Sequence, residues 1–270
     1  MCLFNGICIQ GIVRITKFYA YLRPVNFQEM KKIFVCVLAV LALISCNTKE
    51  DNNLMKVEGS IEGLKKGKIY FQRVEEGKII NIDSIQANGN GTFSFQTSIE
   101  SPEIFYIYLD KNDGNNLNDR LLFFGEPGSN ITINSTRDFF EPNAKVEGSE
   151  TNKKLVEYKK MVSKFSDKNL ELIEKHIRAI QDKNFVLADS LKNASDRNAL
   201  RRYLYSLNFA INNKESYIAP YIALSEVFDA QLKYLDTINN SLTPEVANSK
   251  YGQELAKYIE ELKKEQNEKE

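Results

Sequence analysis

Apolar and polar residues alternate in short runs between residues 55 and 148, and turn-forming residues separate each run from the next. An alternation of this period places every second side chain on one face of a β-strand. Many short strands without intervening helices are typical of an antiparallel β-sandwich, which we expect over residues 55–149. The expected strands cover residues 55–61, 68–73, 78–83, 83–87, 92–96, 104–109, 120–124 and 130–134.

One turn signal in this region is clearer than the others. Residues 88–91 read Asn-Gly-Asn-Gly, and both residue types tolerate the positive φ angles that a tight turn demands. We therefore expect a β-hairpin that joins residues 83–87 to residues 92–96.

The pattern changes to a helical period after Gly148. Apolar residues there recur at the spacing of an amphipathic helix, and each helix should bury its apolar face. Ser149 precedes the first helix in the position of an N-cap. The expected apolar faces are Leu155, Tyr158, Val162 and Phe165; Leu170, Ile173, Ile177 and Ile180; Leu200, Tyr203, Leu204, Leu207, Ala210 and Ile211; and Leu255, Tyr258, Ile259 and Leu262.

These two patterns define the expected fold class. An antiparallel β-sandwich is followed by an all-α domain over residues 150–262, which makes the protein α+β. Residues 263–270 contain no apolar side chain, so we expect this polar tail to fray into solvent.

Residues 30–45 have the organisation of a lipoprotein signal peptide. Two lysines follow Met30, and an apolar run over residues 33–44 leads to Ser45 and Cys46. The run is shorter than the ~20 residues of a membrane-spanning helix, so a cleaved signal is expected. Its end, Leu-Ile-Ser-Cys, resembles the lipobox of bacterial lipoproteins, in which the cysteine is acylated. The resemblance implies a lipid on Cys46 that tethers the protein to a membrane.

The segments on either side of this signal have separate interpretations. Residues 1–29 precede its basic start, and we interpret them as an upstream-extended translation. Residues 46–54 are polar and lack an apolar period, which predicts a lipidated tether. Within it, Lys49, Glu50 and Asp51 resemble the signal that directs Bacteroidetes lipoproteins to the outer face of the outer membrane. Surface exposure is the favoured interpretation, and the periplasmic face is the alternative.

Cysteine and charge exclude several functions. All four cysteines lie within the first 46 residues, and acylation of Cys46 leaves the chain that follows without a thiol for redox chemistry. Removal of residues 1–45 leaves 31 of the 36 basic and 35 of the 36 acidic residues, a net charge of −4. Because nucleic acid and anionic lipid headgroups need a clustered positive surface, neither is an expected partner.

Short motifs in the strand region resemble the Bacteroidetes domain of unknown function 4369, a β-sandwich commonly found just after a lipobox. The resemblance covers about residues 55–150 and depends on the order and spacing of the motifs. They are Val57-Glu-Gly59-Ser-Ile61, Ile82-Asp83-Ser84 with Gly91-Thr-Phe93-Ser-Phe95, Pro102, Phe123-Phe124-Gly125-Glu126-Pro127-Gly128, and Val146-Glu-Gly148-Ser149.

In many relatives of this family the sandwich and a helical linker precede a thioredoxin-like domain that performs thiol-disulfide exchange. Residues 213–222 resemble the Pro-containing helix start of that linker. No Cys-x-x-Cys follows them in this sequence. The resemblance therefore implies a stand-alone version of the amino-terminal half and does not carry the enzymatic activity to this chain.

Three tyrosines in the strand region are candidates for a binding surface. Tyr106 and Tyr108 share one face of an expected strand, and Tyr70 lies on another strand. Their rings offer a rigid stacking surface for a sugar or a partner chain. The alternative, which the absence of tryptophan favours, is that they pack beneath the helices.

Three triplets resemble the O-glycosylation acceptor of exported Bacteroidetes proteins. Their acceptor residues are Ser84, Ser190 and Thr237. Because Ser84 also belongs to the sandwich motif, a purely structural role is the alternative for that residue.

Two polar features of the sequence could suggest a metal site, but neither has the pattern of one. His176 is the only histidine, whereas a metal site or a general base normally needs further converging ligands. An EF-hand loop needs glycine at its sixth position and an acidic residue at its twelfth. Counted from Asp110, glycine is at the fifth position and Leu121 is at the twelfth, so this segment does not match the EF-hand pattern. We expect a surface or boundary histidine and a polar interstrand loop, with an irregular calcium site as the alternative for the loop.

The sequence predicts a non-enzymatic outer-membrane lipoprotein, a binding or interaction module that contacts another envelope protein. No Gly-x-Ser-x-Gly, phosphate-binding glycine loop or dinucleotide fingerprint appears, and no cofactor is expected. One alternative is an accessory to thiol-disulfide exchange that positions a separate thioredoxin-like protein. The other alternative is carbohydrate or nutrient binding at the sandwich face.

Overall fold

The computed structural model describes residues 52–114 and 119–268. The expected extension 1–29, the signal peptide 30–45, and the site residues Cys46, Lys49, Glu50 and Asp51 lie outside the described residues. In the part of the chain that the structure describes, no helix has both the length and the apolarity to cross a bilayer.

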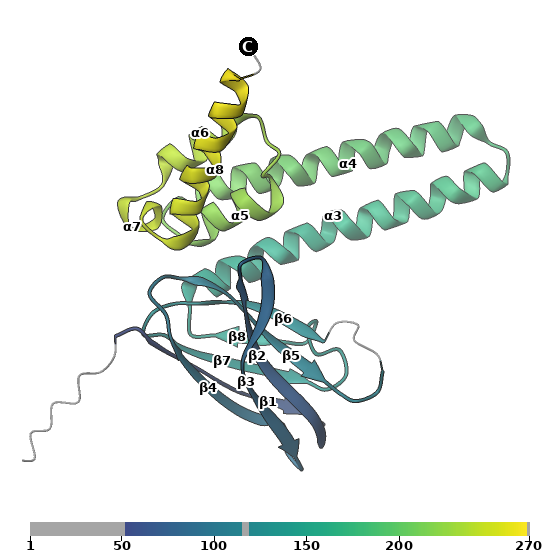
Figure 1. Ribbon diagram of the computed structural model, residues 1–270. Coiled ribbons are helices and arrows are strands. Elements are labelled where there is room, and N and C mark those ends of the chain that lie inside the picture. Colours follow the sequence, from purple (N-terminus) through teal and green to yellow (C-terminus); the bar gives the residue numbers. More distant parts are fainter. Residues whose placement is uncertain (1–51, 115–118, 269–270) are drawn as a thin grey trace, which may run out of the picture. The chain divides into compact units, whose positions relative to one another are not determined.

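The described residues form eight strands followed by six helices (Figure 1). The strands are β1 (Leu54–Glu62), β2 (Lys66–Glu75), β3 (Lys78–Asn88), β4 (Thr92–Ser98), β5 (Glu103–Asp110), β6 (Arg120–Gly125), β7 (Asn130–Thr136) and β8 (Lys145–Glu147). The helices are α3 (Glu150–Gln181), α4 (Phe185–Asn212), α5 (Ile218–Glu226), α6 (Leu232–Ser241), α7 (Pro244–Ala247) and α8 (Lys250–Asn267).

The strands form two four-stranded sheets, in the orders β4-β1-β7-β8 and β3-β2-β5-β6. All pairs are antiparallel except β1 with β7, which is parallel. A Cβ atom at Gly59 would lie 1.7 Å from the Ile133 carbonyl oxygen, so the close approach of β1 to β7 requires glycine there. The expected α+β class, a β-sandwich followed by helices, is confirmed.

The prediction of a β-hairpin around residues 88–91 is wrong. β3 pairs with β2, whereas β4 pairs with β1 in the other sheet. The glycines do form a turn, with φ of 89° at Gly89, but this turn crosses from one sheet to the other. The local sequence specifies the turn, whereas the sheet that the next strand joins depends on distant residues.

The strands expected at 78–83 and 83–87 are one continuous strand, β3. Its register with β2 shifts between Phe71 and Gln72, which lie opposite Asp83 and Asn81. The intervening Ile82 is the extra residue of a β-bulge, and the bulge explains why the alternation reads as two shorter runs.

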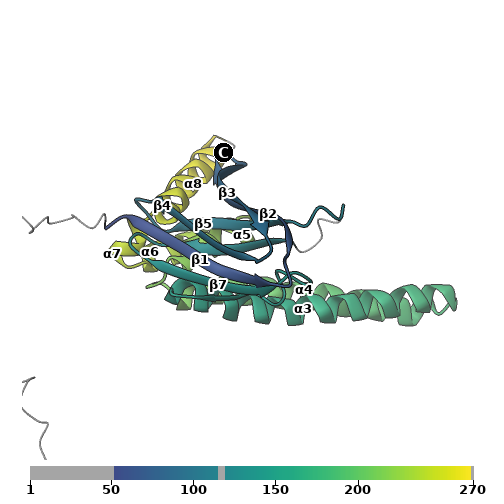
Figure 2. The same ribbon diagram turned by 90° about the horizontal axis from the view of Figure 1, so that it is seen from below.

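Helices α3 and α4, of 32 and 28 residues, form a long antiparallel hairpin (Figures 1 and 2). The turn between them is short because Lys183 adopts a positive φ of 57°. The Asn184 side chain then caps α4 by accepting a hydrogen bond from the Leu187 N–H at 3.1 Å. A single helix therefore carries the first two apolar faces that the sequence predicts.

The prediction that Leu170, Ile173, Ile177 and Ile180 form a buried face is wrong. These side chains are 66%, 41%, 49% and 46% exposed. α3 contacts α4 through an adjacent face, on which Leu172 and Ala179 are buried. A small residue, Ala188, lies opposite that face and lets the helices approach closely. Apolar spacing alone does not distinguish two adjacent faces of one helix.

α8 continues to Asn267 and so includes residues 263–267 of the tail that the sequence predicts to fray. Lys263 Nζ lies 2.8 Å from the Asp236 carboxylate on α6, and this ion pair holds the helix where apolar contacts end. Lysine and glutamate also have good intrinsic helix propensity.

Strands β5 and β6 take part in two hydrophobic cores. Phe105 and Phe123 point between the two sheets and pack in the sandwich core. Ile104 and Phe124, their neighbours in sequence, point to the other face and pack in the core formed with the helices. The alternation of side chains along a strand therefore joins the sandwich to the helical domain.

We predict that Phe124→Ala destabilises the protein by about 3–5 kcal/mol, the usual cost of removing a buried phenylalanine ring. Phe124 is 0% exposed, and its ring packs edge-on against Tyr221 and Tyr251. Urea unfolding followed by far-UV circular dichroism measures the change. Phe139→Ala is the matched control because Phe139 is 69% exposed; equal losses for both variants would contradict the role of Phe124.

Candidate functional site

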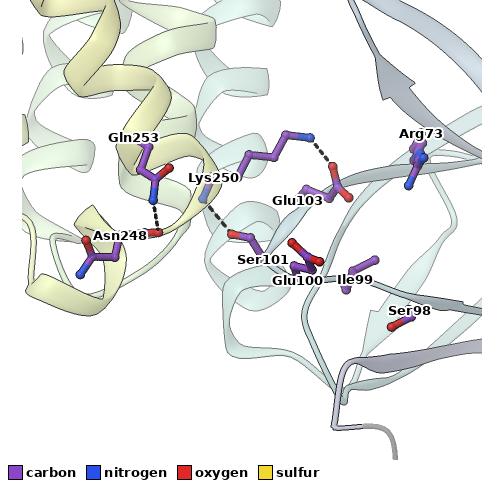
Figure 3. A pocket seen from close by; sticks show the side chains of 9 residues that line it. All are labelled: Arg73, Ser98, Ile99, Glu100, Ser101, Glu103, Asn248, Lys250 and Gln253. Carbon is purple, nitrogen blue, oxygen red and sulfur yellow. Dashed lines mark hydrogen bonds and ion pairs between the residues drawn. The ribbon is translucent and has the colours of Figure 1, made fainter.

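A cleft of about 600 Å³ lies where α8 and the residues before it meet the connection between β4 and β5 (Figure 3). We call it the junction cleft. It is mostly polar, and its lining residues come from three distant parts of the sequence: Arg73, Ser98, Ile99, Glu100, Ser101, Glu103, Asn248, Lys250 and Gln253.

Several polar groups of the junction cleft bond to one another across the gap between helix and sheet. The Lys250 backbone N–H donates to Ser101 Oγ at 2.8 Å, and the Lys250 ammonium pairs with the Glu103 carboxylate (Figure 3). Beside the cleft, the Tyr251 hydroxyl accepts a hydrogen bond from the Ile104 N–H at 3.1 Å. These contacts attach α8 to β5.

This arrangement favours a structural junction over a catalytic centre. Ser101 Oγ accepts from a backbone N–H, whereas an activated serine needs a base within hydrogen-bond reach. Arg73 pairs with Glu75 at 3.1 Å, and Lys250 pairs with Glu103. Both cations of the described cleft lining, Arg73 and Lys250, are therefore paired with carboxylates.

The helical core beside the cleft contains buried tyrosine hydroxyls. Burial raises the pKa of Tyr221 to about 12, and burial raises the pKa of Tyr251 as well. Burial also raises the pKa of Tyr158 to about 12, although its hydrogen bond of 2.7 Å with Ser206 acts in the opposite direction. In each case loss of water disfavours the phenolate, so these groups stay neutral over the physiological range.

The three candidate tyrosines separate into two environments. Tyr106 packs against the helical core, as the alternative interpretation expects. Tyr70 and Tyr108 stack on each other with centroids 5.7 Å apart. Lys68 lies 4.8 Å from the centroid of the Tyr70 ring, and Arg120 lies 5.0 Å from that of Tyr108. Because the two rings stack on each other and each has a cation over it, their faces are less available for stacking with a sugar.

The three candidate O-glycosylation residues lie on three different elements. Ser84 lies on β3 opposite Tyr70, and it is partly exposed. Ser190 is exposed on α4. Thr237 is exposed on α6, where its hydroxyl donates to the Lys233 carbonyl at 2.7 Å. The structure does not bring them together.

His176 bridges the two long helices, since its Nδ1 lies 2.7 Å from the Ala188 carbonyl oxygen. In the described part of the polar interstrand loop 110–119, Lys111 lies 2.8 Å from Asp119, and Arg137 lies 3.3 Å from Asp113. These cations pair with two of the loop carboxylates. Among the described residues, no group of three or more potential ligands converges on a metal position.

The exposed residues Leu170, Ile173, Ile177 and Ile180, which we call the α3 apolar face, form an apolar surface on the helical domain. They recur at a spacing of three and four residues, so they lie along one side of α3. On the surface of a protein in water, a contiguous patch of exposed apolar side chains often indicates an interaction site. The sequence pattern finds these residues but assigns them to the core.

The described residues form a β-sandwich followed by a helical domain. The family model described as "Domain of unknown function (DUF4369)" matches residues 55–155, which span the sandwich and the first turn of α3. This match over residues 55–155 agrees with the resemblance that the motifs predict. No curated protein matches the sequence.

The buried tyrosines predict a loss of stability at alkaline pH. The pKa of Tyr221 rises from its ordinary value of 10.0 to about 12 on folding. A group whose pKa is raised in the folded state stabilises the protein below its unfolded pKa, and this stability is lost as pH rises through the folded pKa. The free energy of unfolding should therefore fall between about pH 10 and 12. Urea titrations at several pH values measure it.

Tyr221→Phe tests the assignment because it keeps the ring and removes the ionisable group. We expect its free energy of unfolding to fall less steeply over this pH range than that of the wild type. The same slope in both proteins would show that the alkaline loss arises elsewhere.

Proposed function

We propose that this protein is a lipid-anchored, non-enzymatic interaction module of the bacterial outer membrane that binds another envelope protein through the α3 apolar face. The exposure of that face, between 41% and 66% for its four side chains, is the observation that carries the proposal. Burial of such side chains against a partner contributes about 25 cal/mol per Å² of apolar surface removed from water.

The geometry of the face fits a helical partner. Spacings of three, four and three residues match the a and d positions of a coiled-coil seam. The charged residues beside it, Glu171, Lys175, Glu174 and Arg178, already pair along α3 itself. The helix is therefore stabilised by its own ion pairs, while its apolar side is available for packing.

The proposed outer-membrane localisation is based on the lipobox-like sequence that ends at Cys46 and on the Lys49-Glu50-Asp51 sequence that follows it. Acylation at Cys46 would hold the described part of the chain near a membrane without a spanning helix. A protein with both a lipid anchor and an apolar interaction face could recruit or position another protein in the envelope.

We predict that Cys46→Ala abolishes incorporation of an alkyne-labelled fatty acid and moves the protein from the membrane pellet to the supernatant. Cys36→Ala is the matched control, because Cys36 lies within the expected signal peptide. Retained labelling and membrane association in the Cys46 variant would contradict lipidation at this residue.

The partner surface is tested by photo-crosslinking in living cells. A photoreactive amino acid at Ile177 should yield a discrete crosslinked species, because that side chain lies on the α3 apolar face. The same amino acid at Lys175, about 200° around the helix axis from Ile177, should yield none. Ile173→Glu should remove the Ile177 crosslink while changing the free energy of unfolding by only about 0.5 kcal/mol.

Two results would count against the proposal. Crosslinks of equal yield at Ile177 and Lys175 would indicate random collisions. A crosslink at Ile177 that survives Ile173→Glu would place the contact outside the α3 apolar face.

A further inference from the structure

Strand β6 has an open edge beside α3. In the sheet order β3-β2-β5-β6, it pairs with β5 on one side only. The Asn152 side chain accepts a hydrogen bond from the Phe124 N–H and donates one to the Phe124 carbonyl, both at 2.8 Å. The backbone groups of Phe124 therefore point away from β5.

Leu122 has the same orientation because backbone groups in a strand alternate between its two sides with a period of two residues. Its N–H and C=O face the open edge, and neither has a hydrogen-bond partner among the described residues on that side. Such an edge is a template for another strand. Since Asn152 occupies the edge at Phe124, an added strand must be short.

A groove of about 550 Å³ lies beside Leu122, between β6 and α3. Its apolar lining includes Leu155 and Val156 of α3 and Ala144 and Val146 from the segment before α3. Val156 remains 51% exposed, so the groove is accessible. Its volume falls within the range of about 300–1,000 Å³ that is usual for ligand sites. The apolar walls suit apolar side chains.

The charges at the rim favour an acidic occupant. Lys159 lies 3.5 Å from Glu141, which partly neutralises it. Lys160 also lines the groove, and it has no ion-pair partner among the described residues. A carboxylate on the bound segment would complement that ammonium group.

We propose that this groove binds an extended segment of another protein, which adds a short strand to β6 at Leu122. Main-chain hydrogen bonds to Leu122 supply affinity, and apolar side chains pack against Val146, Leu155 and Val156. A carboxylate of the segment lies near Lys160. This site is separate from the α3 apolar face, so the two proposals can fail independently.

A phage-displayed library of random short peptides, selected on the purified protein, tests the ligand class. We expect enrichment of peptides that combine apolar β-branched residues with aspartate or glutamate. The enriched peptide is then labelled, and its affinity is measured by fluorescence anisotropy. Val156→Asp and Lys160→Glu should each weaken binding by at least about tenfold.

Matched controls separate the groove from the rest of the surface. Val186→Asp, at a position 84% exposed on α4, and Lys164→Glu, also on α3, should leave the affinity unchanged. Ile177→Glu should also leave peptide binding unchanged, which distinguishes a failure here from a failure of the proposed function. Circular dichroism verifies that each variant is folded.

Amide hydrogen exchange tests strand addition itself. Saturating peptide should slow exchange at the Leu122 N–H by about tenfold or more, because the amide gains a hydrogen bond. The Phe124 N–H, already bonded to Asn152, should change little. The proposal is overturned if no peptide is enriched, if binding ignores Val156→Asp, or if Leu122 exchange is unchanged. It is also overturned if concentration-dependent self-association lost in Val156→Asp shows that a second copy fills the groove.

Discussion

The alternation of side chains along β5 and β6 is the constraint on which the rest of the structure depends. Phe123 points into the sandwich core, and Phe124 points into the helical core. Asn152, in the first turn of α3, bonds both backbone groups of Phe124 and places the start of α3 on the edge of the sheet. α3 begins at this attachment, and α4 packs along α3.

The same attachment determines which surfaces stay available. At the junction cleft, Ser101 and Glu103 are used in contacts with Lys250 that hold α8 against the sheet. By contrast, the outer half of α3 packs against α4 alone and leaves Ile173 and Ile177 in solvent. The helices and the sheet thus join through both the polar contacts of the junction cleft and the buried apolar core around Phe124. The α3 apolar face, by contrast, stays exposed, as is typical of an interaction surface.

Local patterns in the sequence predict the strands, the turn around Gly89 and the helical period. They do not predict which elements pair, because pairing joins distant residues: Val57 lies opposite Phe95, and Lys250 reaches Glu103. The exposed position of Ile177 was missed for a related reason. Its spacing is that of a buried face, and only the close packing of α4 on the adjacent face reveals that nothing in the described fold covers it.

If another protein covers the α3 apolar face in the envelope, the side chains of this face are shielded from solvent there. Hydroxyl-radical footprinting compares side-chain oxidation in intact envelopes with that in the purified protein. Ile177 and Ile79 are matched probes, because they are 49% and 44% exposed and lie on α3 and β3. We expect that oxidation of Ile177 falls in envelopes while that of Ile79 is unchanged. Equal oxidation of Ile177 in both samples would contradict it.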